Sequence, residues 1–78
     1  MTILHPGKAT TGHSHDDADE VYIVMEGKGE IEVGDERFSV QDGDIILIKR
    51  GLFHKTFNTS EKDMKFLCIF EKYKGRGN

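Results

Sequence analysis

The chain has 78 residues, of which 36% are hydrophobic and 32% are charged, and its formal net charge is −3. This length allows one domain, because a core split in two could not offset the entropy of ordering the chain. We therefore expect a single domain over residues 1–78, with 75–78 as a loose tail. The ordinary hydrophobic content and the scattered basic residues favour neither disorder nor nucleic-acid binding.

The single cysteine, Cys68, leaves no partner for a disulfide within the chain and fits a reducing compartment. The longest apolar run, Ile45 to Ile48, is too short to cross a bilayer, and the first residues lack the features of a signal peptide. We expect a soluble, cytoplasmic protein with no membrane partner. A domain this small usually needs a metal or a partner subunit.

The hydrophobic pattern along the first half of the chain is that of β-strands. Residues 20–25 are rich in β-branched and aromatic side chains and are followed by Gly27, which predicts a strand and then a turn. Residues 31–33 and 37–40 alternate apolar and polar around Gly34, Asp35 and Glu36, which predicts a hairpin.

The second half continues the pattern. Residues 45–48 are apolar at every position, which favours a central strand covered on both faces. After Gly51, residues 54–58 and 64–70 are predicted strands separated by a polar loop. Short strands at regular spacing, without a helical period, predict an all-β sandwich or small barrel.

Three histidines and one carboxylate stand out as a candidate metal site. His13 and His15 are two residues apart, so on an extended segment their side chains leave the same face. The acidic stretch 16–19 is a predicted turn after which Glu20 starts a strand, and a closed sheet could bring His54 to the same place. The spacing predicts three nitrogen donors and one oxygen donor. Two surface histidines in a polar loop are the alternative.

The glycines around these residues make a more specific pattern. The first motif consists of Gly7, five residues, His13, one residue, His15, four residues, Glu20, six residues and Gly27. The second consists of Gly43, six residues, Arg50, Gly51, two residues, His54, three residues and Asn58. In residue types and spacing these two motifs resemble the signature motifs of the cupin superfamily. Only the usual proline of the second motif is missing, and Lys49 replaces it.

The resemblance implies a small jelly-roll, or double-stranded β-helix, barrel that holds a divalent metal, with His13, His15, Glu20 and His54 as ligands. The segments around these ligands are also similar to the archaeal cupin-type phosphoglucose isomerases, which are longer. A cupin-type dioxygenase is equally compatible with the ligands.

Three imidazoles and a carboxylate suit iron, manganese, zinc, nickel, copper or cobalt better than calcium or magnesium. An octahedral ion would keep two positions open for a small molecule, whereas a tetrahedral zinc site would be closed. The sequence therefore leaves three functions open: a small-molecule metalloenzyme, a non-catalytic module that binds a small ligand or metal, and a structural metal staple.

Five further residues carry expectations. Tyr22 shares the face of Glu20 and Asn58 that of His54, so both are catalytic candidates, although a tyrosine that fills space and an asparagine that bonds within the sheet are the alternatives. Leu67 and Ile69 should face outward, which favours a homodimer packed sheet to sheet, while Cys68 should be in the core.

Overall fold

The computed structural model describes residues 1–12, 14 and 18–72, and seven β-strands dominate this part of the chain. The strands are β1 (Thr2–Leu4), β2 (Ala18–Glu26), β3 (Lys28–Val33), β4 (Glu36–Gln41), β5 (Ile45–Ile48), β6 (His54–Phe57) and β7 (Met64–Lys72). The predicted loose tail, 75–78, lies outside the described residues, as do His13 and His15. No helix long and apolar enough to cross a membrane occurs in the described part of the chain.

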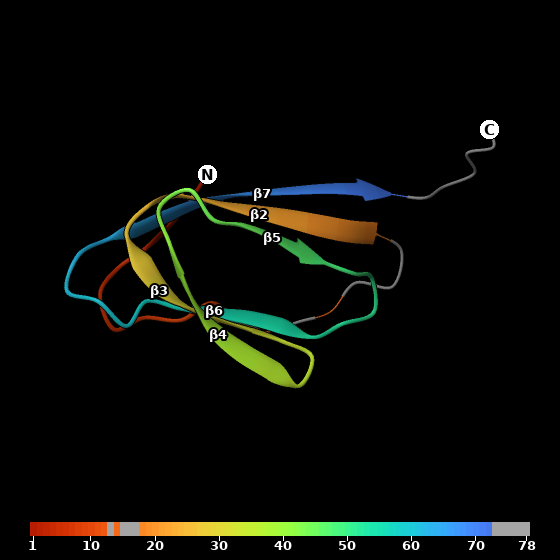
Figure 1. The fold of residues 1–78 in the computed structure, drawn as a ribbon, viewed down its shortest axis with the longest axis horizontal. Helices are drawn as coiled ribbons and strands as arrows, with labels where there is room; N and C mark the ends of the chain where they lie inside the picture. Colours follow the sequence, from red (N-terminus) through yellow and green to blue (C-terminus); the bar gives the residue numbers. More distant parts are fainter. Residues whose placement is uncertain (13, 15–17, 73–78) are drawn as a thin grey trace.

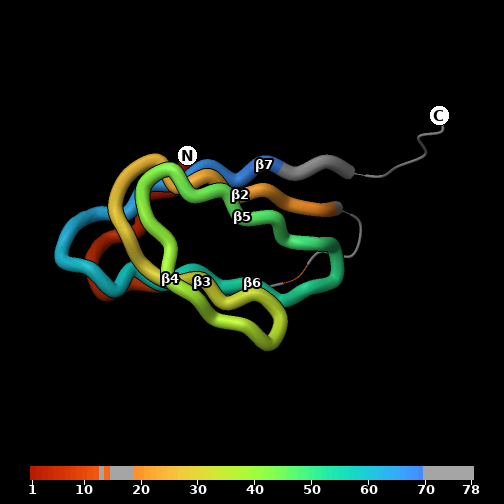
Figure 2. Tube along the Cα trace, viewed as in Figure 1, coloured from red at the N-terminus to blue at the C-terminus, as the bar shows by residue number. Residues whose placement is uncertain are grey.

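The strands form two antiparallel sheets that face each other. One sheet has the order β1-β7-β2-β5 and the other the order β4-β3-β6. Figure 1 shows them as two layers, with β2, β5 and β7 above and β3, β4 and β6 below. The tube in Figure 2 shows the chain passing repeatedly between the layers, so that neighbours in a sheet are often distant in sequence. This arrangement confirms the predicted all-β class.

The predicted hairpin is confirmed and its strands are longer than expected. β3 pairs with β4 from Lys28 opposite Gln41 to Val33 opposite Glu36, which leaves a loop of Gly34 and Asp35. Gly34 has a φ of +59°, and among the described residues only glycines have a positive φ. A positive φ at the first of two loop positions defines a type II′ turn, whose twist matches that of the flanking strands.

The core lies between the two layers and follows the two-residue alternation of each strand. Its buried side chains come from six strands: Leu4, Tyr22, Val24, Ile31, Val40, Ile46, Ile48, Met64 and Phe66. Both sheets contribute, so neither layer can bury its inward face without the other.

The prediction that β5 is a central strand covered on both faces is wrong. β5 lies at an edge of its sheet, and only Ile46 and Ile48 are buried. Ile45 and Leu47 are 69% and 55% exposed. An uninterrupted apolar run results because this sheet carries apolar side chains on its outer surface as well as on its inner one.

Candidate metal centre

A carboxylate and an imidazole from opposite layers meet inside the barrel. Glu20 lies near the start of β2, and His54 is the first residue of β6 in the other sheet. The Nε2 atom of His54 is 2.8 Å from Oε1 of Glu20, and the two side chains are only 2% and 4% exposed. The fold therefore joins two of the four predicted ligands, which come from the two separate motifs.

The imidazole of His54 is oriented by the backbone. Its Nδ1 atom is 3.3 Å from the carbonyl oxygen of Leu52. Because a carbonyl accepts a hydrogen bond, Nδ1 carries the donated hydrogen, and Nε2 faces Glu20. A neutral imidazole whose outer nitrogen donates to a backbone carbonyl is the usual form of a metal-binding histidine.

The geometry of this pair fits a divalent metal. Ligand atoms that bind one ion at about 2.1 Å in adjacent positions, at a right angle, lie about 3 Å apart. The separation of 2.8 Å between Nε2 of His54 and Oε1 of Glu20 is close to this value. Two buried donors of this type, one nitrogen and one oxygen, also match the preference of first-row divalent ions.

Thr10 and Gly12, which precede the other two predicted ligands in the sequence, lie against β6 and Phe53. Thr10 accompanies β6, since its amide donates to the Thr56 carbonyl at 2.9 Å and its Oγ1 accepts from the Thr56 amide at 3.0 Å. Gly12 lies so close to the ring of Phe53, beside His54, that a Cβ there would be 2.1 Å from the ring. Within the described residues, no three histidine, cysteine or acidic side chains converge as a metal site; His13 and His15 lie outside this part.

Glu20 has a second contact that the sequence reading missed. The thiol of Cys68 donates to Oε2 of Glu20 at 2.9 Å. Cys68 is exposed, so its predicted place in the core is wrong. It faces inward from β7, opposite Tyr22, but beyond the closely packed Phe66. Partial burial, followed by the bond to and the charge of Glu20, raises the pKa of the thiol to about 12, so the thiol keeps its proton at neutral pH.

Tyr22 lies beside this cluster, as its position on the face of Glu20 predicts. It is buried, stacks on Phe66 with ring centroids 5.2 Å apart, and meets the ring of His54 edge-on at 5.7 Å. Burial above all, and then the nearby Cys68 and Glu20, raise the pKa of its hydroxyl, which hydrogen-bonds to Cys68. Tyr22 is thus a neutral donor beside the two metal-ligand candidates.

Asn58 has a different place. Its side chain is buried, and Nδ2 donates to the carbonyl oxygens of Leu4 at 2.8 Å and Lys62 at 2.7 Å. Its Oδ1 accepts from the amide and the hydroxyl of Ser60 at 2.9 and 2.8 Å. These four hydrogen bonds hold the loop after β6 against β1, at the end of β6 away from His54.

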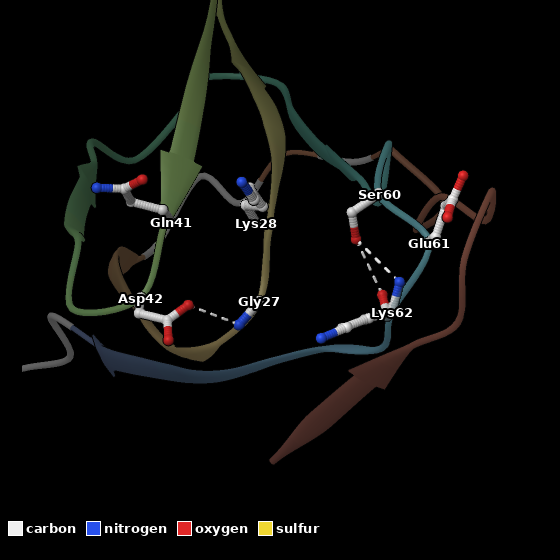
Figure 3. A pocket seen from close by; sticks show the side chains of 7 residues that line it. All are labelled: Gly27, Lys28, Gln41, Asp42, Ser60, Glu61 and Lys62. Atoms are coloured by element: carbon white, nitrogen blue, oxygen red, sulfur yellow. Dashed lines mark hydrogen bonds between the residues drawn. The ribbon is translucent and has the colours of Figure 1, made fainter.

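A surface pocket of about 670 Å³ lies at the other end of β2 from Glu20. Figure 3 shows its lining, with Asp42 beside Gly27 on one side and Ser60, Glu61 and Lys62 on the other. Oδ1 of Asp42 accepts from the amide of Gly27 at 2.7 Å. This pocket is therefore separate from the Glu20 and His54 pair.

Comparison with known proteins identifies the family. The family model described as "Cupin domain" matches residues 1–70. The chain belongs to the cupin family, as its two motifs predict.

Two curated relatives are enzymes with different printed activities. A glucose-6-phosphate isomerase of Thermococcus litoralis is 34% identical over 82 residues, and a 5-nitrosalicylic acid 1,2-dioxygenase of a Bradyrhizobium species is 34% identical over 69 residues. Each alignment covers 88% of this chain, but only 43% of the isomerase and 33% of the dioxygenase. The chain thus spans less than half the length of these two relatives.

Solved structures agree with this assignment. A cupin protein from Bacteroides fragilis superimposes with a TM-score of 0.85 at 30% identity, covering 91% of this chain and 61% of the other. Together with the two-layer topology, this match confirms the predicted double-stranded β-helix barrel of the cupin type.

Proposed function

We propose that this protein binds one divalent transition metal through His13, His15, Glu20 and His54, and that the metal serves a small-molecule reaction. The observation that carries the proposal is the buried pair of Glu20 and His54, whose donor atoms are 2.8 Å apart between the two sheets. Taking a carboxylate and an imidazole out of water is costly unless the two groups are paired or bind an ion. Iron, manganese, zinc, nickel, copper and cobalt all suit this donor set.

The residues around the pair have separate roles in this proposal. A metal with open positions would polarise or chelate a substrate as a Lewis acid. Cys68 orients the carboxylate of Glu20 through Oε2, which leaves Oε1 turned toward His54. Tyr22 is the candidate for donating a proton or a hydrogen bond, because its hydroxyl is neutral and beside the site. Asn58, whose hydrogen bonds are all made with the chain, is assigned a structural role.

The reaction is an isomerisation or a dioxygenation in this proposal. The names of the two curated relatives support these classes, and neither is favoured over the other by sequence identity. Sugar phosphates and hydroxylated aromatic acids are the corresponding compounds to test. A dioxygenase would consume oxygen and need a redox-active metal, whereas an isomerase would do neither. We expect the protein to work in the cytoplasm, where the thiol of Cys68 stays reduced.

Metal analysis of untagged protein tests the site. We expect close to one equivalent of metal in the wild type and a loss of most of it in His54→Ala and Glu20→Ala. The matched control is His5→Ala, because His5 is an exposed histidine paired with Asp63 rather than with Glu20. Metal content that is unchanged in His54→Ala would refute the proposed ligand set.

A structural staple is the main competing role, and chelation separates the two. Loss of the β-sheet spectrum on chelation would support a staple, because a staple adds its binding free energy to folding. A folded metal-free protein that no longer converts a substrate would support the enzyme. A folded protein that binds a small ligand without turnover, with or without metal, would support a non-catalytic module.

A further inference from the structure

The side chains of β6 alternate between the barrel interior and the outer surface. His54 and Thr56 are buried, whereas Lys55 and Phe57, which alternate with them, are only partly buried. This is the two-residue period of a strand, so His54 and Thr56 point inward on the same face. Asn58 follows the strand in the same phase and is buried too. Three polar side chains therefore follow one another along the inner side of this sheet, and Thr56 is the middle one.

The hydroxyl of Thr56 differs from its two polar neighbours in its hydrogen bonds. Asn58 makes four hydrogen bonds with the chain, and Nε2 of His54 faces Glu20. The Oγ1 atom of Thr56 is buried and has no hydrogen-bond partner within residues 1–12, 14 and 18–72. The backbone of Thr56 needs no help from this hydroxyl, because its amide and its carbonyl are both bonded to Thr10.

A buried hydroxyl without a partner lowers the stability of a fold. It gives up its hydrogen bonds to water when the chain folds and regains none inside. Valine has the shape of threonine and would fill the same space without this cost. Because buried polar groups in proteins are nearly always hydrogen-bonded, an unpartnered one indicates a partner that is not part of the chain.

We propose that the hydroxyl of Thr56 donates a hydrogen bond to an acceptor atom of the small molecule that is held beside Glu20 and His54. This inference rests on the proposed function, because the metal would hold that molecule. Alternate residues of a strand are about 6.7 Å apart, so a molecule of a few atoms next to His54 can reach Thr56. The hydrogen of a hydroxyl can rotate toward its acceptor, and a carbonyl or carboxylate oxygen is the kind of acceptor that it fits.

The other neutral donors near the pair are already bonded to the chain. The thiol of Cys68 donates to Oε2 of Glu20, and the hydroxyl of Tyr22 is hydrogen-bonded to Cys68. Tyr22 would have to give up this bond in order to contact a ligand, whereas Thr56 would give up none. The contact with Thr56 therefore adds the whole free energy of a new hydrogen bond to ligand binding.

The surroundings of Thr56 make this contact selective. Ile31, which stands directly opposite Thr56 on β3, is 1% exposed, as Thr56 itself is. The hydroxyl is thus kept from water, and a molecule without an acceptor would leave it unpartnered. A site that hydrogen-bonds one group of its ligand strongly rejects analogues that lack this group. Thr56 is therefore a specificity-determining residue in this proposal.

Azide titration of the cobalt-loaded protein, followed by visible absorption, tests the contact. Azide is a small anion that binds at open positions of a metal and accepts hydrogen bonds. We expect its dissociation constant to rise about 10-fold in Thr56→Val, which loses the donor, and to change by less than about 3-fold in Thr56→Ser, which keeps it. Both variants should contain as much cobalt as the wild type, since Thr56 is not a proposed ligand.

Thermal unfolding of the metal-free protein tests the unpartnered state of the hydroxyl separately. We expect Thr56→Val to raise the midpoint of unfolding by about 4–8 °C, because it removes a buried hydroxyl without a partner. The matched control is Thr59→Val, the same change at an exposed residue. It should shift the midpoint by no more than about 3 °C and leave the affinity for azide as it is.

Three results would overturn the inference. An unchanged affinity for azide in Thr56→Val would exclude the contact. A lower unfolding midpoint in metal-free Thr56→Val would assign the hydroxyl a partner within the chain. Loss of cobalt from Thr56→Val would place Thr56 in the metal site itself. A wild type that binds no cobalt would refute the proposed function together with this inference, whereas a cobalt-loaded protein with unchanged azide affinity in Thr56→Val would refute this inference alone.

Discussion

Replacing Asn58 with alanine separates a structural asparagine from a catalytic one. The substitution removes four hydrogen bonds, two donated to the carbonyls of Leu4 and Lys62 and two accepted from Ser60. A typical hydrogen bond contributes about 1 kcal/mol net, and a buried group left without a partner costs more. The groups of Ser60 can turn to water, whereas the bond to Leu4 is buried. We therefore expect a loss of about 3 kcal/mol in the free energy of unfolding.

This loss is large for a chain of 78 residues. Stabilities of roughly 0.05–0.15 kcal/mol per residue suggest about 4–12 kcal/mol in total. The midpoint of thermal unfolding should fall by about 15 °C, since 1 kcal/mol shifts it by about 4–8 °C in domains of this size. Urea unfolding followed by far-UV circular dichroism measures the change directly, and the protein has no tryptophan to follow instead.

Metal content is the second measurement on Asn58→Ala. At about 3.3 Å per residue along a strand, Asn58 lies roughly 13 Å from His54, so the folded variant should keep its metal. Thr59→Ala, at the exposed neighbouring residue, is the control and should stay within about 0.5 kcal/mol of the wild type. A stable Asn58→Ala protein that has lost metal or turnover would refute the structural assignment and return Asn58 to the site.

Substitutions at three further positions test other parts of the structure. Gly29→Ala should cost more than about 2 kcal/mol in urea unfolding, because its Cβ would be 2.2 Å from the carbonyl oxygen of Phe57; wild-type stability would contradict this close approach. Ile31→Ala, at a side chain 1% exposed, should cost about 3 kcal/mol and Ile31→Val about 1 kcal/mol, and equal losses would mean that the cavity does not set the cost. Cys68→Ala should weaken metal binding about 10-fold in a chelator competition, because Glu20 loses its orienting donor, while Cys68→Ser should restore most of it; unchanged affinity in Cys68→Ala would exclude this orienting role.

The strands could be predicted from sequence because their alternation is local. The hairpin around Gly34 follows from the residue types and their two-residue period. In the structure its strands are longer than predicted, and the turn lies at Gly34 as expected. The pairing of Glu20 with His54 is not local, and it was predicted only because two spaced motifs together resemble those of a known family. The strand β1, by contrast, has only three residues, which are too few to show an alternating pattern in the sequence.

Other features depend on neighbours that no local pattern describes. Cys68 lies on the same face of β7 as the buried Met64 and Phe66, yet it is exposed and bonded to Glu20. The apolar run at 45–48 predicts a strand buried on both faces, but the run forms an edge strand whose outward side chains are exposed to solvent.

The sequence by itself determined the strands other than β1, the turn of the hairpin and the family, since these follow from backbone preferences and from residue types at set spacings. Only the tertiary structure decided which side chains meet: Glu20 with His54, Cys68 with Glu20, and Asn58 with the loop after β6. It also decided that Ile45 and Leu47 are exposed on an edge strand. The physical reason is that contacts between strands of different sheets depend on how the layers pack, which no single strand encodes.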